Sequence, residues 1–205
     1  MEKDLSSRSK IIEGAIRVFA QHNYEKASTT MIAQAAGLSK GLIFHYFGSK
    51  ADLFLATYQE VATIIIDRIV DKINYVETDM LLRLKESIWL KLDVMQTFPE
   101  IFEFLKAAYF EHPPELKEGM QQINSGILDQ GMAKIYQNID YSRFRDDIDA
   151  RLAINTIHFT LEKWSENYNQ ELFHAPFDRL GYEDAINKID PYLALFRKCF
   201  YKEAV

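Results

Sequence analysis

Apolar residues recur with the spacing of amphipathic helices along almost the whole chain. In the first segment they fall three or four positions apart, which places them on one side of a helix. Asn23 follows this stripe, and asparagine tolerates the left-handed conformation that closes many helices, so we expect the helix to end there. Beyond residue 75 we find no alternation of apolar and polar positions typical of strands. The pattern predicts an all-α protein with about nine helices. The first stripe consists of Ile12, Ala15, Ile16, Phe19 and Ala20.

Two short helices with a tight turn between them are predicted near the N-terminus. Ser28 or Thr29 offers a hydroxyl to cap the first helix, and Gly37 ends it by accepting the positive φ of a turn. Ser39 is expected to cap the second helix, over residues 40–47. Two short helices joined by three residues that include glycine are typical of a helix-turn-helix.

The remainder of the chain divides into further helices. We expect them over residues 50–74, 78–97, 99–110, 114–138, 148–172 and 182–201. The run His112-Pro113-Pro114 breaks the chain, and Pro191 must kink the last helix or begin a new segment.

The composition is that of an ordinary globular protein, with 48% hydrophobic and 26% charged residues. The only cysteine is Cys199, so no internal disulfide framework or multi-cysteine zinc site is possible, and we expect it to be a small buried hydrophobe. The polar start holds no signal-peptide core, and no apolar run approaches the ~20 residues that cross a bilayer. We therefore expect a cytoplasmic protein without a membrane partner.

The net charge of −6 is unevenly distributed. Residues 1–50 contain seven Lys or Arg and four Asp or Glu, a net charge of +3, whereas the rest of the chain carries −9. This asymmetry is expected where one end of a protein meets phosphate and the other does not.

The segment from Ile11 to Leu53 resembles the N-terminal domain of the tetracycline-repressor (TetR) family of bacterial regulators. The matching pieces are IIEGAIRVFAQHNYEKAS, TTMIAQAAG, LSKGLIFHYF and GSKADLF, in that order. The resemblance implies a DNA-binding domain over residues 1–49, a helical ligand-binding and dimerisation domain over residues 50–205, and a homodimer.

Three positions depart from the family pattern. Asn23 stands where the family usually has glycine, and the same left-handed cap can accommodate it. Gly14 replaces a common alanine and should cost the first helix ~1 kcal/mol. Phe44 replaces a tyrosine whose hydroxyl often reaches phosphate.

The second helix of the motif is the one expected to enter the major groove, with its N-terminal residues at base edges. Lys40 can donate to guanine or only to phosphate, and Leu42 can touch a thymine methyl group. For His45, a DNA contact and a solvated surface position are equally plausible. Lys50 is expected to contact phosphate. The predicted DNA-binding residues are Ser28, Thr29, Ser39, Lys40, Gly41, Leu42, Phe44, His45, Tyr46 and Lys50.

Aromatic residues are frequent in the C-terminal part, where they either fill the core or line an elongated apolar pocket. The pocket interpretation predicts an apolar or aromatic effector. His158, Glu162 and Glu166 share one helical face, which suits a ligand pocket, a metal or, more simply, an exposed or interface strip. The candidate ligand-binding residues are Trp89, Phe98, Phe102, Tyr109, Tyr136, His158, Glu162 and Trp164.

The last two helices carry apolar residues on more than one side, and either the rest of the chain or a second copy must cover them. The resemblance favours a dimer built on them. The sequence holds no catalytic or Gly-rich phosphate-binding motif, so we expect neither an enzyme nor a cofactor or metal. The function predicted is a transcriptional repressor that a small effector releases from a DNA operator with two half-sites. The alternative is a DNA-binding regulator whose C-terminal domain docks a protein partner.

Overall fold

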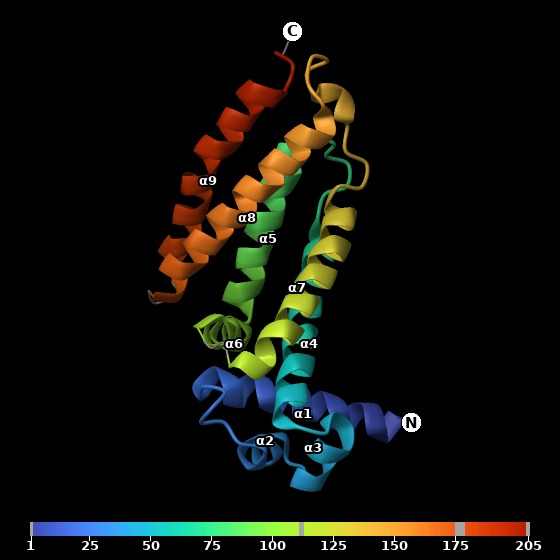
Figure 1. Ribbon diagram of the computed structural model, residues 1–205, viewed down its shortest axis with the longest axis vertical. Coiled ribbons are helices and arrows are strands. Elements are labelled where there is room, and N and C mark those ends of the chain that lie inside the picture. The colour runs from blue at the N-terminus through green and yellow to red at the C-terminus, as the bar shows by residue number, and fades with distance from the viewer. Residues whose placement is uncertain (1, 111–112, 175–178, 204–205) are drawn as a thin grey trace. The chain divides into compact units, whose positions relative to one another are not determined.

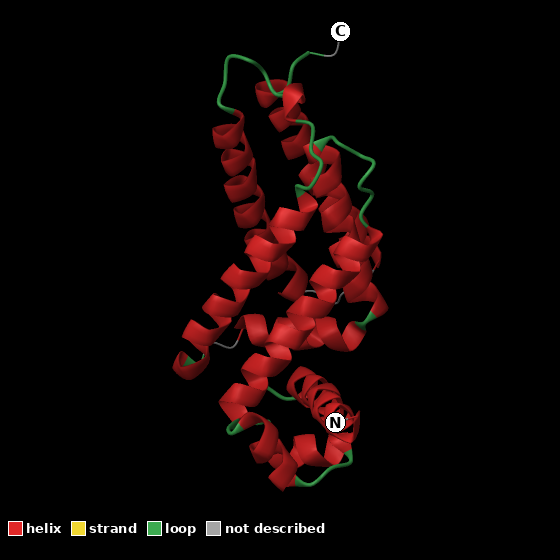
Figure 2. Ribbon diagram, turned by 90° about the vertical axis from the view of Figure 1, so that its right-hand side faces the viewer, coloured by secondary structure: helices red, strands yellow, loops and turns green. Residues whose placement is uncertain are grey.

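The structure, a computed structural model, describes residues 2–110, 113–174 and 179–203. Within these ranges the chain forms nine α-helices and one 3₁₀ helix, and the β-type pairing is limited to a single bridge between Phe144 and Tyr201 (Figures 1 and 2). The predicted all-α architecture with about nine helices is confirmed. The elements are α1 (Glu2–Gln21), α2 (Thr29–Ala36), α3 (Lys40–Phe47), α4 (Lys50–Lys72), α5 (Met80–Thr97), α6 (Pro99–Phe110), α7 (Pro114–Ile135), η1 (Tyr141–Arg143), α8 (Ala150–His174) and α9 (Arg179–Phe200).

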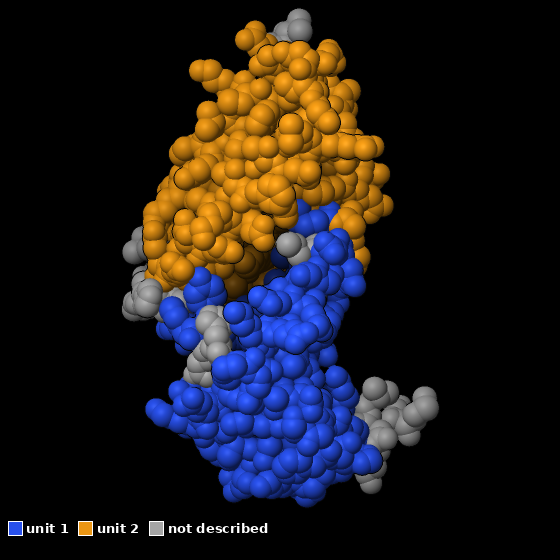
Figure 3. All heavy atoms as spheres, viewed as in Figure 1, with its two compact units in different colours: residues 1–70, 97–132 blue, residues 71–96, 133–205 orange. Residues whose placement is uncertain are grey.

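The chain divides into two compact units, which Figure 3 shows. The first unit comprises residues 1–70 and 97–132, and the second comprises residues 71–96 and 133–205. The boundary expected between residues 49 and 50 separates a DNA-binding domain from a ligand-binding domain. It describes a division of function, and it stays a prediction. Among the described residues, no helix has the length and apolar character that crossing a membrane requires. His112, one of the predicted breaking residues, lies outside the described residues.

In the first unit, α1 packs against α2 and α6. The predicted apolar stripe of α1 is buried from Ile12 to Phe19. Gly14 lies where α1 and α2 approach most closely, since a Cβ atom there would be 3.0 Å from the backbone nitrogen of Ala36 and 3.1 Å from the carbonyl oxygen of Ile32. The glycine that weakens α1 as a helix thus permits its close contact with α2.

The connection from α1 to α2 differs from the prediction. We expected Asn23 to adopt the left-handed conformation, but among the described non-glycine residues only Asn138 has a positive φ, of 62°. The Asn23 side chain instead accepts a hydrogen bond from the backbone N–H of Lys26 at 3.0 Å, and its carbonyl accepts one from Ala27 at 2.8 Å. Asparagine therefore shapes this turn through its side chain rather than through a positive φ.

The second unit contains most of α5, a helix with apolar residues buried around most of its circumference. The same helix carries the fully buried side chain of Arg83. Helices α8 and α9 pack against each other in this unit, side by side in Figure 1. The buried apolar residues of α5 are Met80, Leu81, Leu84, Leu90, Leu92, Val94 and Met95.

Of the two alternatives predicted for Pro191, a new segment is excluded, because α9 continues through it from Arg179 to Phe200. The expectation for Cys199 needs correction. Cys199 is exposed rather than buried. It follows Tyr192 and Leu195 at helical spacing, and both of these are exposed as well, so the three residues share the outer face of α9.

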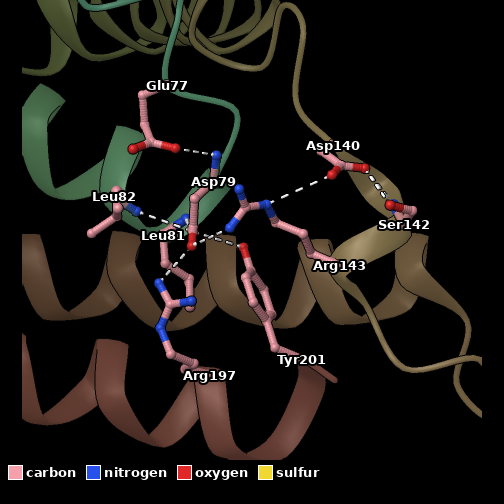
Figure 4. Close-up of polar contacts among 9 residues, drawn as sticks. All are labelled: Glu77, Asp79, Leu81, Leu82, Asp140, Ser142, Arg143, Arg197 and Tyr201. Carbon is pink, nitrogen blue, oxygen red and sulfur yellow. Dashed lines mark hydrogen bonds and ion pairs between the residues drawn. The ribbon is translucent and has the colours of Figure 1, made fainter. Parts of the chain in front are cut away.

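A buried carboxylate ties the start of α5 to the end of the chain (Figure 4). Asp79 is 1% exposed and accepts hydrogen bonds from the backbone N–H of Leu81 at 2.9 Å and from the hydroxyl of Tyr201 at 3.1 Å. The guanidinium groups of Arg197 and Arg143 lie 2.7 and 3.4 Å from its other oxygen. Burial acts to raise the pKa of Asp79, but the hydrogen bonds and the charge of Arg197 lower it below its ordinary value.

Candidate nucleic-acid interface

Local hydrogen bonds fix the turn between α2 and α3. The hydroxyl oxygen of Ser28 accepts a bond from the N–H of Met31 at 3.2 Å and so caps α2, as predicted. Gly37 closes the helix in the left-handed conformation, with φ of 65°. The N–H of Leu38 then donates to the carbonyl of Ala33 at 2.9 Å. The predicted helix-turn-helix is confirmed in this geometry.

Helix α3 has one buried side and one exposed side. Ile43 is 0% and Phe47 8% exposed, and these two residues lie one turn apart on the side that faces the core. The rest of the helix presents a mixed surface of a cation, an imidazole and an aromatic ring. Its exposed residues are Lys40, Gly41, Phe44 and His45, and Leu42 and Tyr46 are partly buried.

The first residues of α3 depart from the expected capping. Ser39 occupies the N-cap position, but its side chain makes no capping hydrogen bond. The ammonium of Lys40 lies 5.8 Å from the ring centroid of Phe44, which is 47% exposed. The rings of His45 and Tyr46 contact each other edge to face, with their centroids 5.2 Å apart.

The start of α2 offers less surface than the sequence suggested. The oxygen of Ser28 is engaged in the cap, and Thr29 is buried. Their predicted phosphate contacts stay a prediction. Thr30, which our sequence analysis did not select, is the exposed hydroxyl of this first turn. The sequence contained a signal for Thr30, because three consecutive residues with hydroxyl groups precede Met31. Only their burial in the structure distinguishes the three.

Lys50 makes contacts within the protein. Its ammonium donates to the carbonyl oxygens of Tyr24 at 2.9 Å and Ala27 at 3.3 Å, and it lies 4.3 Å from the ring centroid of Tyr24. An ammonium has three N–H donors, so these two bonds leave one for another partner. The expected phosphate contact of Lys50 is neither confirmed nor contradicted.

Tyr24 is a residue of this region that the sequence analysis missed. It is 5% exposed, and its hydroxyl donates to a carboxylate oxygen of Glu115, at the start of α7, at 2.6 Å. Burial, followed by the hydrogen bond to Glu115, raises the pKa of Tyr24. The residue therefore connects the turn after α1 to α7 and, through Lys50, to α4. These partners lie 26 and 91 positions away, and no local pattern reveals them.

The candidate ligand-binding residues are distributed over both units. In the first unit Phe102 is 1% exposed and belongs to the core, whereas Phe98 and Tyr109 are partly buried. In the second unit Trp89 is 46% exposed, and the ring of Trp164 stacks on Tyr168 with the centroids 5.2 Å apart. The assignment of these residues to an effector pocket stays a prediction.

Tyr136, also selected from the sequence, has a buried hydroxyl that finds no hydrogen-bond partner among the described residues. On α8, His158 is partly buried, and Glu162 and Glu166 are exposed. Glu166 pairs with Lys163 at 2.8 Å, which suits the interpretation of a solvated strip. Within the described ranges, no three His, Cys, Asp or Glu residues are grouped as a metal ion requires.

Comparisons with known proteins place this geometry among DNA-binding regulators. Residues 11–57 match the family model described as bacterial regulatory proteins, tetR family. The chain is similar to the HTH-type transcriptional repressor AcnR of Corynebacterium glutamicum, with 30% identity over 168 residues that cover 78% of this chain and 79% of AcnR.

Two solved structures share the fold. The fatty acid degradation regulator FadR from Bacillus halodurans is 23% identical with a TM-score of 0.66, and the match covers 93% of this chain and 98% of FadR. FadR from Bacillus subtilis, solved in complex with stearoyl-CoA, is 20% identical with a TM-score of 0.61, over 92% of this chain and 96% of that one. The fold, the helix-turn-helix and the similarity to AcnR agree, and the chain belongs to the tetR family of bacterial regulatory proteins.

Proposed function

We propose that this protein represses transcription as a homodimer whose two α3 helices enter successive major grooves of an operator. The observation that carries the proposal is the division of α3, with Ile43 and Phe47 in the core and Lys40, Gly41 and Phe44 outside. A helix of this kind fits the major groove, and a two-fold dimer reads half-sites about one helical turn or a multiple apart. The operator is therefore expected to contain two inverted half-sites.

The exposed side of α3 supports particular contacts. Lys40 can donate to guanine or to phosphate, and Gly41 lets the backbone approach the DNA closely. Phe44 and Leu42 offer apolar surface for thymine methyl groups. A phenylalanine cannot donate a hydrogen bond to phosphate, so this position would contribute to base selection rather than to general affinity.

We assign dimerisation to α8 and α9. Both helices keep large apolar side chains in solvent, with Leu152 66% and Phe159 65% exposed on α8 and Leu195 54% exposed on α9. A monomer rarely leaves several large apolar side chains of two adjoining helices in solvent, and a second copy of the same pair of helices would cover them by a two-fold contact.

The effector is proposed to be a small molecule with an apolar or aromatic body that binds within residues 50–205. Support comes from the aromatic side chains of this part and from the similarity to FadR of Bacillus subtilis, whose structure was solved with stearoyl-CoA. The effector releases the operator because it prefers the dimer in which the two α3 helices no longer match the half-sites. A shift from 1:99 to 99:1 requires a preference of about 5.5 kcal/mol.

Selection of duplexes from a randomised pool tests the function. The enriched sequences should contain two inverted half-sites, and Leu42→Ala should change which bases are enriched. Lys40→Ala should weaken binding, whereas Lys134→Ala removes the same charge from an exposed position of α7 and should leave binding unchanged. A protein that retains no duplex at low ionic strength would refute the proposal, and so would a single, unpaired half-site.

A further inference from the structure

Helix α5 carries three polar residues at regular spacing, among apolar residues that belong to the core. Arg83, Ser87 and Lys91 follow each other at intervals of four positions, which places them on one side of the helix. Arg83 is 0% and Ser87 9% exposed. Polar groups in such surroundings are costly unless they are hydrogen-bonded, so the partners of each residue are informative.

Arg83 forms hydrogen bonds with the backbone at the end of α7. Its guanidinium donates to the carbonyl oxygens of Ile135 and Gln137, each at 3.1 Å, and to that of Glu77. It also lies 5.2 Å from the ring centroid of Tyr75. The charge therefore rests on carbonyl dipoles at a helix C-terminus, where a cation is favourable. This arginine has a structural role.

Ser87 is satisfied within α5, since its hydroxyl donates to the carbonyl of Leu84 at 2.8 Å. Lys91 differs from both neighbours. Among the described residues no carboxylate or other hydrogen-bond acceptor pairs with its ammonium. The side chain is rooted between Ser87 and Met95, which are 9% and 2% exposed, and it retains some accessible surface.

An unpaired ammonium in this position is unfavourable for the protein alone. Burial disfavours the charged form and lowers the pKa of Lys91. A hydrophobic residue of similar length would avoid this cost. A cation that has no partner among the described residues and keeps some accessible surface is suited to binding an anion.

A second hydrogen-bonding group of the same unit is also unused. The hydroxyl of Tyr136 is buried without a partner among the described residues. Tyr136 stands between Ile135 and Gln137, whose carbonyls hold Arg83, and is thereby joined to α5 two helical turns before Lys91. The Nε–H of Arg83 is likewise buried without a partner among the described residues. Together with the ammonium of Lys91, these groups are hydrogen-bond donors of one unit that the described residues leave unsatisfied, which suits a ligand that supplies an acceptor.

We infer that the effector is an organic anion with an apolar body, and that the ammonium of Lys91 binds its acidic group. This inference rests on the proposed function of residues 50–205 as the effector-binding part. It narrows the ligand from any apolar molecule to one that carries a carboxylate or a comparable acid. A charge-assisted hydrogen bond in surroundings of low polarity supplies the selectivity, and the apolar residues of the unit supply contact area.

Binding of three dodecyl probes tests the inference: dodecanoate, its methyl ester and dodecylamine, measured by calorimetry with the full-length protein. Dodecanoate should bind to the wild type at least tenfold more tightly than the ester, and dodecylamine should bind more weakly still. Lys91→Met should reduce dodecanoate binding at least tenfold, to the level of the ester. Lys134→Met removes an exposed lysine of α7 and should change neither value.

Thermal unfolding without any probe gives an independent readout. Because Lys91→Met removes a partly buried charge that has no partner among the described residues, at nearly constant volume, its unfolding midpoint should rise. A lower midpoint would mean that the ammonium has a structural partner and would overturn the inference. Equal affinity of wild type for acid and ester, or no binding of dodecanoate, would overturn it as well. Operator binding is measured separately on the wild type. If the protein binds dodecanoate but no DNA duplex, the proposed function as a regulator is refuted, whereas the anion site at Lys91 is not.

Discussion

The ammonium of Lys50 lies 2.9 Å from the carbonyl oxygen of Tyr24 and faces the ring of the same residue at 4.3 Å. Lys50 is the first residue of α4, and Tyr24 belongs to the turn between α1 and α2. The contact therefore joins the helix that follows α3 to the turn that precedes α2. A lysine selected from the sequence as a phosphate contact also holds the DNA-binding helices together.

Replacement of Lys50 by alanine should affect both stability and DNA binding. The loss of two hydrogen bonds and of the contact with the Tyr24 ring should lower the free energy of unfolding by about 1–2 kcal/mol. If the third N–H donor reaches phosphate, the slope of log affinity against log salt should also fall by about one. Urea unfolding and salt titrations measure the two effects separately. If stability falls but the salt dependence of DNA binding is unchanged, Lys50 contributes only through its contacts within the protein and does not bind phosphate.

The sequence predicted those parts of the fold that depend on neighbouring residues. The apolar stripe of α1, the cap at Ser28 and the turn at Gly37 follow from spacing and from the chemistry of single residues, and all three are present. The outward side of α3 was predictable for the same reason, since Ile43 and Phe47 lie one turn apart.

Features that depend on distant partners escaped the sequence analysis. The acceptors of Lys50 are backbone carbonyls, which every residue has, so no residue type marks them. The exposure of Cys199 depends on which side of α9 meets α8. The turn at Asn23 is the exception, since its partners are local: its side chain competes with the left-handed backbone conformation, and both options are common for asparagine.

Gly14→Ala should destabilise the protein although alanine is the better helix former. The gain in helix propensity is about 1 kcal/mol, but the new methyl group would meet backbone atoms of Ala36 and Ile32 at 3.0–3.1 Å, which only a shift of α2 can relieve. We expect a net loss of about 1 kcal/mol and weaker operator binding. Gly41→Ala is the control, because the nearest atom to its Cβ is 4.0 Å away, and it should gain stability. A stabilised Gly14→Ala variant would contradict the assignment of this glycine to helix packing.

The carboxylate of Asp79 should make the free energy of unfolding depend on pH in the acidic range. Its pKa in the folded protein lies below the ordinary value of 3.8, so its contribution is complete above that pH and is lost as the pH falls through the lowered pKa. The free energy of unfolding of the wild type should therefore decline below about pH 4. Asp79→Asn should lose about 2 kcal/mol at neutral pH, because Arg143 and Arg197 lose the negative charge that they share, and its stability should change less with acid.

Asp147→Asn is the matched control for this measurement. Asp147 also pairs with an arginine, Arg145, at 2.6 Å, but both side chains are exposed, and exposed pairs contribute little. Chemical unfolding followed between pH 2 and pH 7 should distinguish the two variants. Equal losses in both would show that burial of the Asp79 network contributes nothing beyond a surface ion pair.

The final prediction concerns the proposed dimer surface. Leu195→Glu places a charge on the outer face of α9, where Leu195 is 54% exposed, and burial of that charge against a second copy would be strongly unfavourable. We expect analytical ultracentrifugation to find a single 23.9 kDa chain instead of a pair. Operator binding should fall at least a hundredfold, since two linked half-site contacts become one. Leu82→Glu introduces the same charge on α5 at a leucine that is 47% exposed, and it should remain dimeric with full operator affinity. Dissociation of both variants, or of neither, would mean that the copies associate through a surface other than α8 and α9.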